Sequence, residues 1–125
     1  MSTSVPLNQA KAELFRTLGH PVRIRVLELL QPGPVAVRDL LPDLEIEASS
    51  LSQQLAVLRR AGLVSSTRQG ATVRYSLSTP HVADLLRAGR EILASVLSGA
   101  EGLLAELRED VAEAAEVGEP TGERA

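Results

Sequence analysis

Hydrophobic residues along this chain recur mostly at intervals of three and four, the spacing that places them on one face of an α-helix. Gly19 is a natural helix stop, and Pro21 suits the first position of a new helix. The run Pro32-Gly33-Pro34 interrupts the second helical pattern, and Gly62 ends the fourth. The pattern therefore predicts four short helices, at residues 7–18, 21–30, 39–44 and 49–61.

The spacing changes to a period of two over residues 72–77, where apolar and polar residues alternate as they do in a strand. An extended stretch at 63–68 precedes it, and a turn containing glycine at 69–71 joins the two. These features predict a β-hairpin. A further short extended segment is expected at 35–37.

Helical spacing returns at Pro80 and predicts a long helical region, weakened or bent near its middle by Gly99 and Gly102. The 125 residues suffice for one domain, expected over 1–115. Residues 116–125 are rich in glycine and charge and are expected to form a disordered acidic tail. Short helices followed by a two-stranded ribbon predict a mostly α-helical, winged helix-turn-helix fold with a C-terminal helical extension.

Composition excludes several classes of protein. The chain has no cysteine, so disulfides, zinc fingers, thiolate metal sites and cysteine nucleophiles are ruled out. It has two histidines in dissimilar contexts, no phosphate-binding glycine loop and no paired carboxylates, which argues against an enzyme. It shows neither a secretory signal nor an apolar run of the roughly 18 residues that a membrane helix needs. We expect a soluble cytoplasmic protein.

The net charge of −3 argues, taken whole, against nucleic acid as a partner, but the charge is unevenly distributed. Eleven basic and eight acidic residues give residues 1–99 a charge of +3, whereas residues 100–125 carry −6. Residues 48–83 contain four arginines and no acid. This basic segment is either a solvated face or a surface for nucleic acid.

The sequence SQQLAVLRRAGLV at 52–64, with Arg68-x-Gly70 and Tyr75-x-Leu77 after it, resembles the ArsR/SmtB family of winged-helix transcriptional regulators. LGHPVRIRVL at 18–27 is similar to the opening of that family's second helix. The matches together span about residues 14–97. The resemblance implies a homodimer that binds operator DNA, usually as a repressor, and releases it when an inducer binds.

Alignment with the family's recognition helix places Ser49, Ser52 and Gln53 at positions that read bases. The side-chain chemistry fits, because glutamine can bind adenine with two hydrogen bonds and serine can bond either kind of base. A second interpretation is that Ser50 and Gln53 form a capping box, in which Gln53 folds back onto the start of the helix.

Four arginines complete the candidate DNA-binding surface. Arg68 and Arg74 fall on the predicted hairpin, where a wing would contact phosphate or the minor groove. Arg59 and Arg60 would reach phosphates or remain solvated. Tyr75 is expected to anchor the wing to the core. A dimer carrying two such helices would match a palindromic site with half-sites about one helical turn apart.

The first and last helices are the candidate dimer interface, because the last one keeps apolar residues for longer than a small domain needs. The alternative is that it packs within its own chain. The acidic residues of the C-terminal region form a solvated helix face, repel DNA from the wrong side of the protein, or dock a partner protein. The interface residues expected are Leu7, Leu14, Phe15, Leu86, Leu93, Val96 and Leu97.

Many relatives in this family sense metals. The family's zinc site on the last helix uses an Asp-x-His pair and a His-x-x-Glu pair from two subunits. Here His81 matches the first histidine, but Thr79, Ile92 and Ser95 stand at the other three positions. That zinc site is therefore not retained.

A variant metal site could join His81 and Asp84, which are neighbours on one helix face, to Glu91 of the second chain. Nickel, cobalt or zinc would suit such nitrogen and oxygen ligands. The simpler interpretation is that His81 and Asp84 belong to the first helical turn, where an acid is favoured. His20, before Pro21, is expected to be a turn or cap residue.

Three functions remain open at this point. The first is a regulator with a metal response, and the second is a regulator of the same type without one. The third is a winged-helix module that binds only proteins, which would have no need of the acid-free segment.

Overall fold

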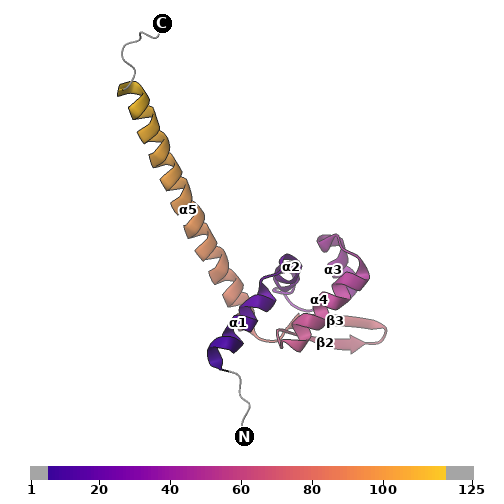
Figure 1. Ribbon diagram of the computed structural model, residues 1–125. Coiled ribbons are helices and arrows are strands. Elements are labelled where there is room, and N and C mark those ends of the chain that lie inside the picture. Colours follow the sequence, from indigo (N-terminus) through magenta and orange to yellow (C-terminus); the bar gives the residue numbers. More distant parts are fainter. Residues whose placement is uncertain (1–5, 118–125) are drawn as a thin grey trace. The chain divides into compact units, whose positions relative to one another are not determined.

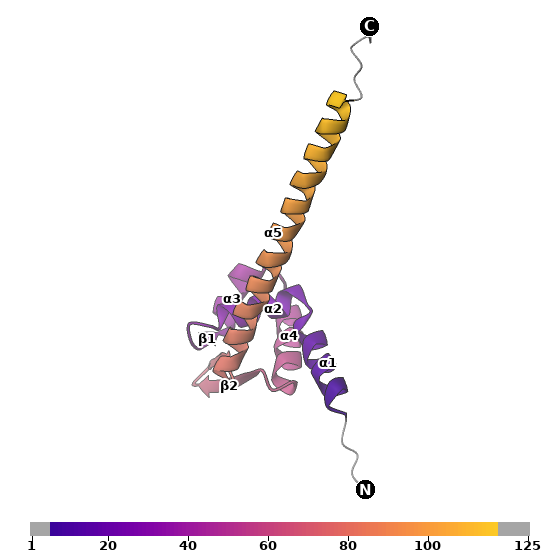
Figure 2. The same cartoon turned by 90° about the vertical axis from the view of Figure 1, so that its left-hand side faces the viewer.

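The computed structural model describes residues 6–117 and divides into two compact units, one ending at Leu86 and the other beginning at Arg87. The elements along the chain are labelled in Figure 1, apart from β1, which is labelled in Figure 2. They are α1 (Leu7–Leu18), α2 (Pro21–Leu29), β1 (Val35–Ala36), α3 (Val37–Leu44), α4 (Ala48–Arg60), β2 (Val64–Gln69), β3 (Thr72–Leu77) and α5 (Pro80–Val117). The winged helix-turn-helix order expected from the sequence is confirmed.

An aliphatic core holds the first unit together. Leu51, Leu55 and Leu58, on one side of α4, are at most 1% exposed. They belong to one cluster with Leu27 of α2 and Leu40 of α3, and no polar residue of the described chain is buried. Because these leucines lie four and three residues apart, burying them all fixes the rotation of α4 about its own axis.

A three-stranded antiparallel sheet in the order β1-β3-β2 packs beside these helices. Tyr75 of β3 pairs with Val35 of β1 and Ser66 of β2, and it packs against the core as a half-buried residue, so the expected wing anchor is confirmed. Figure 2 shows β1 next to α3, with which it makes contact. The strands therefore attach the wing to the helical core.

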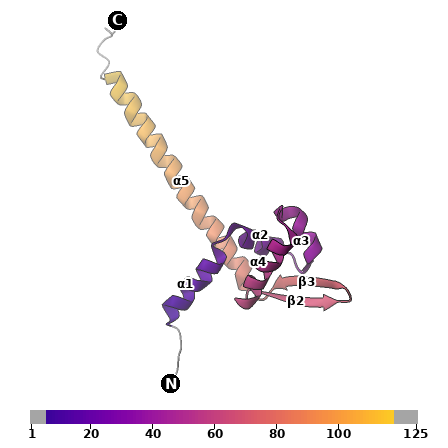
Figure 3. The ribbon, with the colours of Figure 1, turned by 45° about the vertical axis from the view of Figure 1, so that its right-hand side comes forward.

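The turn of the hairpin is shorter than expected, because Gln69 pairs with Thr72 and leaves only two residues between them. Gly70 takes a φ of 65°, a left-handed conformation that glycine adopts without strain. Figure 3 shows the β2–β3 ribbon extending from the helices with this turn at its free end.

The junction between α1 and α2 shows the expected role of His20. Its Nδ1 accepts a hydrogen bond of 3.2 Å from the backbone N–H of Val22, and Pro21 occupies the first position of α2. His20 is thus a helix cap, as expected. By contrast, α3 begins at Val37, two residues before the predicted start.

The second unit is the greater part of α5, a single helix of 38 residues. The bend expected at Gly99 and Gly102 is absent, and Figures 1 and 3 show the helix running straight through this region. The reason is that glycine in a helix interior costs only about 1 kcal/mol relative to alanine and leaves the hydrogen bonds intact. The helix includes the first two residues of the predicted tail, and residues 118–125 lie outside the described part.

Replacing Leu58 by alanine should lower the free energy of unfolding by about 2–5 kcal/mol, because it leaves a cavity in the fully buried cluster. Denaturant unfolding followed by circular dichroism measures this. The neighbouring exposed substitution Arg59→Ala serves as the control and should change stability by no more than about 0.5 kcal/mol. Equal effects of the two substitutions would contradict this account of the core.

Candidate nucleic-acid interface

The outward side of α4 is polar and built from small or hydrogen-bonding side chains. Ser49, Ser52 and Gln53 are exposed and lie on the side of the helix opposite the buried leucines. Short side chains let a helix approach base edges closely, and amide and hydroxyl groups can bond to those edges. The structure thus brings together the three residues predicted to read bases.

The capping-box interpretation of Gln53 is wrong. The helix begins at Ala48 with Glu47 at the N-cap position, and no side chain of the described chain caps it by a hydrogen bond. Ser50 is therefore the third residue of the helix and not its cap. A capping box requires the serine at the cap position, so this motif does not engage Gln53.

The wing carries two arginines, and the strand register shows how they are oriented. Arg68 pairs with Val73, whereas Arg74 pairs with Thr67. Neighbouring residues in a strand point to opposite faces, so the two arginines lie on opposite faces of the hairpin. Both are exposed. The wing therefore carries one positive charge on each of the two faces of its hairpin.

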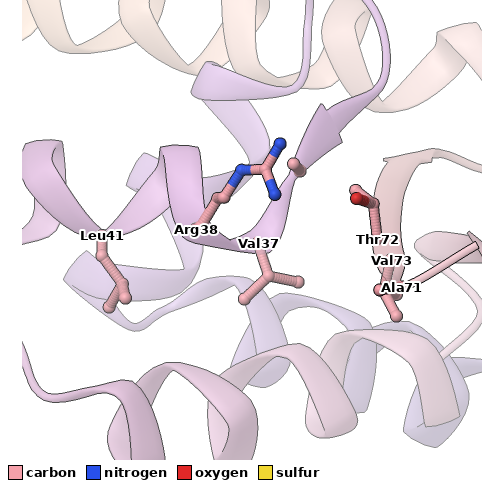
Figure 4. A pocket seen from close by; sticks show the side chains of 7 residues that line it. Val37, Arg38, Leu41, Ala71, Thr72 and Val73 are labelled. Carbon is pink, nitrogen blue, oxygen red and sulfur yellow. The ribbon is translucent and has the colours of Figure 1, made fainter.

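A fifth cation that the sequence pattern missed lies beside the wing. Arg38, exposed in the first turn of α3, lines an open pocket of about 380 Å³ together with Ala71, Thr72 and Val73 of the hairpin (Figure 4). It is the only charged residue lining that pocket. The sequence pattern did not single out Arg38, because Arg38 directly precedes Asp39 and lies outside the acid-free segment.

Arg59 and Arg60 occupy the last turn of α4 and are both exposed. Cations are favoured at a helix C-terminus, so their position has a structural reason as well as a functional one. The acid-free segment covers α4, β2 and β3 entirely. Positive charge on these elements is therefore not neutralised by any acid of their own.

The side chain of Arg23, from α2, connects α4 to the end of α1. Its Nε donates to Oε1 of Gln54 at 2.7 Å, a contact between residues 31 positions apart. Its Nη1 donates to the carbonyl oxygen of Thr17 at 3.1 Å. Gln54 directly follows Gln53 and is half-buried, so this contact fixes α4 next to the residues predicted to read bases.

A family model described as "Bacterial regulatory protein, arsR family" matches residues 20–66. The HTH-type transcriptional regulator Rv0081 of Mycobacterium tuberculosis is 50% identical over 106 residues, which cover 84% of this chain and 93% of the relative. This chain belongs to the ArsR family. It is a transcriptional regulator with a winged-helix DNA-binding fold, and its relatives are regulators and not enzymes.

Other relatives agree with this assignment of the chain to the ArsR family. The regulator NmtR of M. tuberculosis is 44% identical over 87 residues, 66% of this chain and 72% of the relative. The crystal structure of Rv0081 superimposes with a TM-score of 0.73 at 51% identity, covering 78% of this chain and 98% of that one. The structure of HlyU from Vibrio cholerae gives a TM-score of 0.63 at 34% identity, covering 70% and 97%.

In this ArsR-family chain, two of the three predicted metal ligands lie together at the start of α5. Nδ1 of His81 is 3.8 Å from Oδ2 of Asp84, and both side chains are exposed. The backbone N–H of His81 donates to Oγ1 of Thr79, which fits a helix-start residue. Within residues 6–117 no cluster of three acidic or histidine side chains is able to hold a metal ion. One chain thus supplies an incomplete ligand set.

Most of the predicted dimer residues are exposed large hydrophobics. On α1 these are Leu7, Leu14 and Phe15, and on α5 they are Leu93, Val96 and Leu97. Leu86 differs, because it is half-buried against the core of its own chain. Within residues 6–117, the helices lack the combined length and hydrophobicity needed to cross a membrane.

Replacing Arg23 by alanine should lower the free energy of unfolding by about 1–3 kcal/mol, because a charged donor to two half-buried acceptors is lost. Arg25→Ala is the matched control, since Arg25 lies on the same helix but makes only an exposed ion pair with Glu28. That control should cost no more than about 0.5 kcal/mol. Thermal or urea unfolding measures both, and an equal loss would contradict the proposed link between α1 and α4.

Proposed function

We propose that this ArsR-family regulator is a homodimeric repressor that reads a palindromic operator with α4 and the wing. Ser49, Ser52 and Gln53 contact base edges in the major groove. Five exposed arginines of α3, α4 and the wing contact phosphates or the minor groove, and they are Arg38, Arg59, Arg60, Arg68 and Arg74.

One observation carries this proposal. Burial of Leu51, Leu55 and Leu58 fixes α4 in the rotation that exposes its serines and Gln53, on elements that contain no acid. A module that binds only proteins would not require an acid-free surface. Neutral hydrogen-bonding groups flanked by cations match DNA, in which base edges lie between two lines of phosphate.

Repression is the direction of regulation that we propose, and two relatives support it. A biofilm growth-associated repressor of Agrobacterium fabrum is 39% identical over 77 residues, and an SmtB-type transcriptional repressor of Synechocystis is 38% identical over 79. A transcriptional activator, HlyU of V. cholerae, is 40% identical over 76 residues. A reporter fused to the target promoter decides between the two directions, because loss of the regulator raises expression under a repressor.

The homodimer is supported by the apolar residues that one chain leaves in water. Phe15 of α1 is 58% exposed and Leu7 is 68% exposed. Large apolar patches on a soluble protein mark association sites. A two-fold dimer presents two copies of α4 and therefore matches a palindromic operator.

Replacing Gln53 by alanine should relax base discrimination at one position of each half-site. The expected loss is about 1–3 kcal/mol, the discrimination that one two-bond contact to a base provides. Gel shifts with DNA from upstream of the chain's own gene, and with single-base variants of it, measure this. Equal affinities of wild type and Gln53→Ala across all variants would exclude Gln53 as a base-reading residue.

Arg68→Ala provides the contrasting variant for that experiment. Loss of a phosphate contact should weaken binding to every sequence alike and reduce the slope of log affinity against log salt by about 1. An Arg68→Ala protein with unchanged salt dependence would remove the wing arginine from the interface.

A metal response is a separate hypothesis, favoured by the proximity of His81 and Asp84. It requires Glu91 from a second chain, because no third ligand lies within reach in the described part of one chain. Calorimetric titration with nickel, cobalt and zinc tests it. If the regulator binds such an ion here, His81→Ala loses the heat of binding, whereas identical titrations of the two proteins exclude the site.

A further inference from the structure

The pocket beside the wing has the size of a small-ligand site. We call it the α3–wing pocket, and it is lined by residues 36–38 and 41, at the junction of β1 and α3, and by residues 71–73 of the hairpin. All of them belong to the first unit. The volume of about 380 Å³ falls within the range of about 300–1,000 Å³ that is typical of ligand sites. A water molecule occupies about 30 Å³ in the liquid, so the pocket has room for on the order of ten non-hydrogen atoms.

Most of the wall of the α3–wing pocket is apolar. Five of its seven lining residues are alanine, valine or leucine, among them Val37 and Leu41 of α3. Val73 lies two residues before Tyr75 on β3, so it shares with Tyr75 the face of the strand that packs on the core. A ligand that fills this pocket therefore needs an apolar body.

Arg38 is the one charged residue that lines the pocket. Within residues 6–117 its guanidinium forms no ion pair and no hydrogen bond. No acid stands three or four residues from it in the sequence, and Asp39, which follows it, does not line the pocket. Figure 4 shows the side chain of Arg38 extending from α3 toward the hairpin, which carries Thr72 across the pocket. The pocket thus offers one cation and one hydroxyl group to a ligand.

A second arginine raises the positive potential beside the pocket. Arg68 of β2 pairs with Val73, and residues paired in this way place their side chains on the same face of a hairpin, with Cβ atoms about 5 Å apart. Arg68 therefore lies on the pocket side of the wing. The segment from residue 48 to residue 83 contains no acid that could offset its charge. Two cations, with no carboxylate in the lining, favour an anion over a metal ion as the ligand.

We infer that the α3–wing pocket binds a small organic anion in which a carboxylate is joined to a short apolar body. A carboxylate matches the planar fork of a guanidinium with two parallel hydrogen bonds, and its single charge balances the single cation of the lining. A neutral apolar ligand would cover Arg38 without giving it a partner, which costs free energy. A phosphate of DNA would pair with Arg38 but leave the apolar wall in contact with water.

A carboxylate bound here competes with DNA for Arg38. A guanidinium whose fork holds a carboxylate cannot also neutralise a phosphate of the operator, and this step rests on the proposed function, in which Arg38 contacts phosphate. The bound anion also adds negative charge beside the wing, which repels DNA. The carboxylate therefore lowers the affinity for DNA, and by linkage DNA lowers the affinity for the carboxylate by the same factor.

Benzoate is the first probe, because its size fits the pocket. The full chain, labelled with ¹³C at the methyl groups of valine and leucine, is titrated with benzoate by NMR. Methyl resonances of Val37, Leu41 and Val73 should shift together with one Kd of about 1 mM or below, which a ligand of this size can provide. Benzamide, which has the same shape without the charge, and acetate, which lacks the ring, should each bind at least about tenfold more weakly.

Substitution of Arg38 tests whether the carboxylate binds at this guanidinium. Arg38→Gln should weaken benzoate binding at least about tenfold, whereas Arg38→Lys keeps the charge and should restore part of the loss. Arg59→Gln is the matched control, since it removes an equal charge from an exposed arginine that does not line the pocket. It should leave the Kd unchanged within about twofold, because salt screens distant charges.

Two outcomes of the titration overturn the site. One is an equal Kd for benzoate in the wild type and in Arg38→Gln, with circular dichroism showing that both are folded. The other is the absence of shifts at the methyl groups of Val37, Leu41 and Val73 with benzoate, phenylacetate and hexanoate alike.

Gel shifts with DNA from upstream of the chain's own gene test the competition. Saturating benzoate should lower the affinity of the wild type for this DNA about fivefold or more, and that of Arg59→Gln by the same factor. In Arg38→Gln, benzoate should change the affinity by less than about twofold. A wild-type affinity that benzoate leaves unchanged overturns the competition for Arg38.

The two measurements separate this inference from the proposed function. The NMR titration contains no DNA, so benzoate binding by a protein that shifts no DNA supports the pocket and overturns the proposed function. DNA binding by a protein whose pocket takes none of the three carboxylates supports the proposed function and overturns this inference.

Discussion

Burial of three leucines on one side of α4 is the constraint on which the rest of the first unit depends. Leu51, Leu55 and Leu58 contribute to the core that α2, α3 and the sheet share. Their removal from water provides most of the energy that holds α4 in place. A helix held in this way cannot rotate about its own axis, so the same residues of α4 always face outward. The polar surface that α4 presents to solvent is thus determined by the three leucines that it buries.

Periodicity predicted most of the fold, because burial depends on which face a residue occupies. Periodicity does not reveal which segments far apart in the sequence contact each other, or in which register they pair. The contact between Arg23 and Gln54 joins residues 31 positions apart, and the opposite orientation of Arg68 and Arg74 follows from strand register. The prediction of a capping box at Ser50 and Gln53 was wrong for a related reason, because it depended on residues outside the motif. Ser50 and Gln53 form a capping box only if the helix begins directly after Ser50, and the helix begins earlier, after Glu47.

The charge of the chain follows the same division as its structure. α4, β2 and β3, which carry most of the candidate DNA-binding surface, contain arginines and no acid, whereas six of the acids beyond residue 100 lie on α5. Carboxylates on α5 repel phosphate. A net charge of −3 is therefore compatible with DNA binding, since the excess of acids lies beyond residue 100, in the second unit.

Arg23 gives the first unit a direct connection between its two predicted surfaces. α1 carries exposed residues that we assign to the homodimer, and its end at Thr17 shares the guanidinium of Arg23 with Gln54 of α4. A dimeric reader must hold its two recognition helices about one turn of DNA apart, near 34 Å. In the dimer proposed above, a change in the tilt of α1 would reach α4 through this side chain. In that proposed dimer, the spacing of the two α4 helices would therefore depend on the geometry of the contact between the α1 helices.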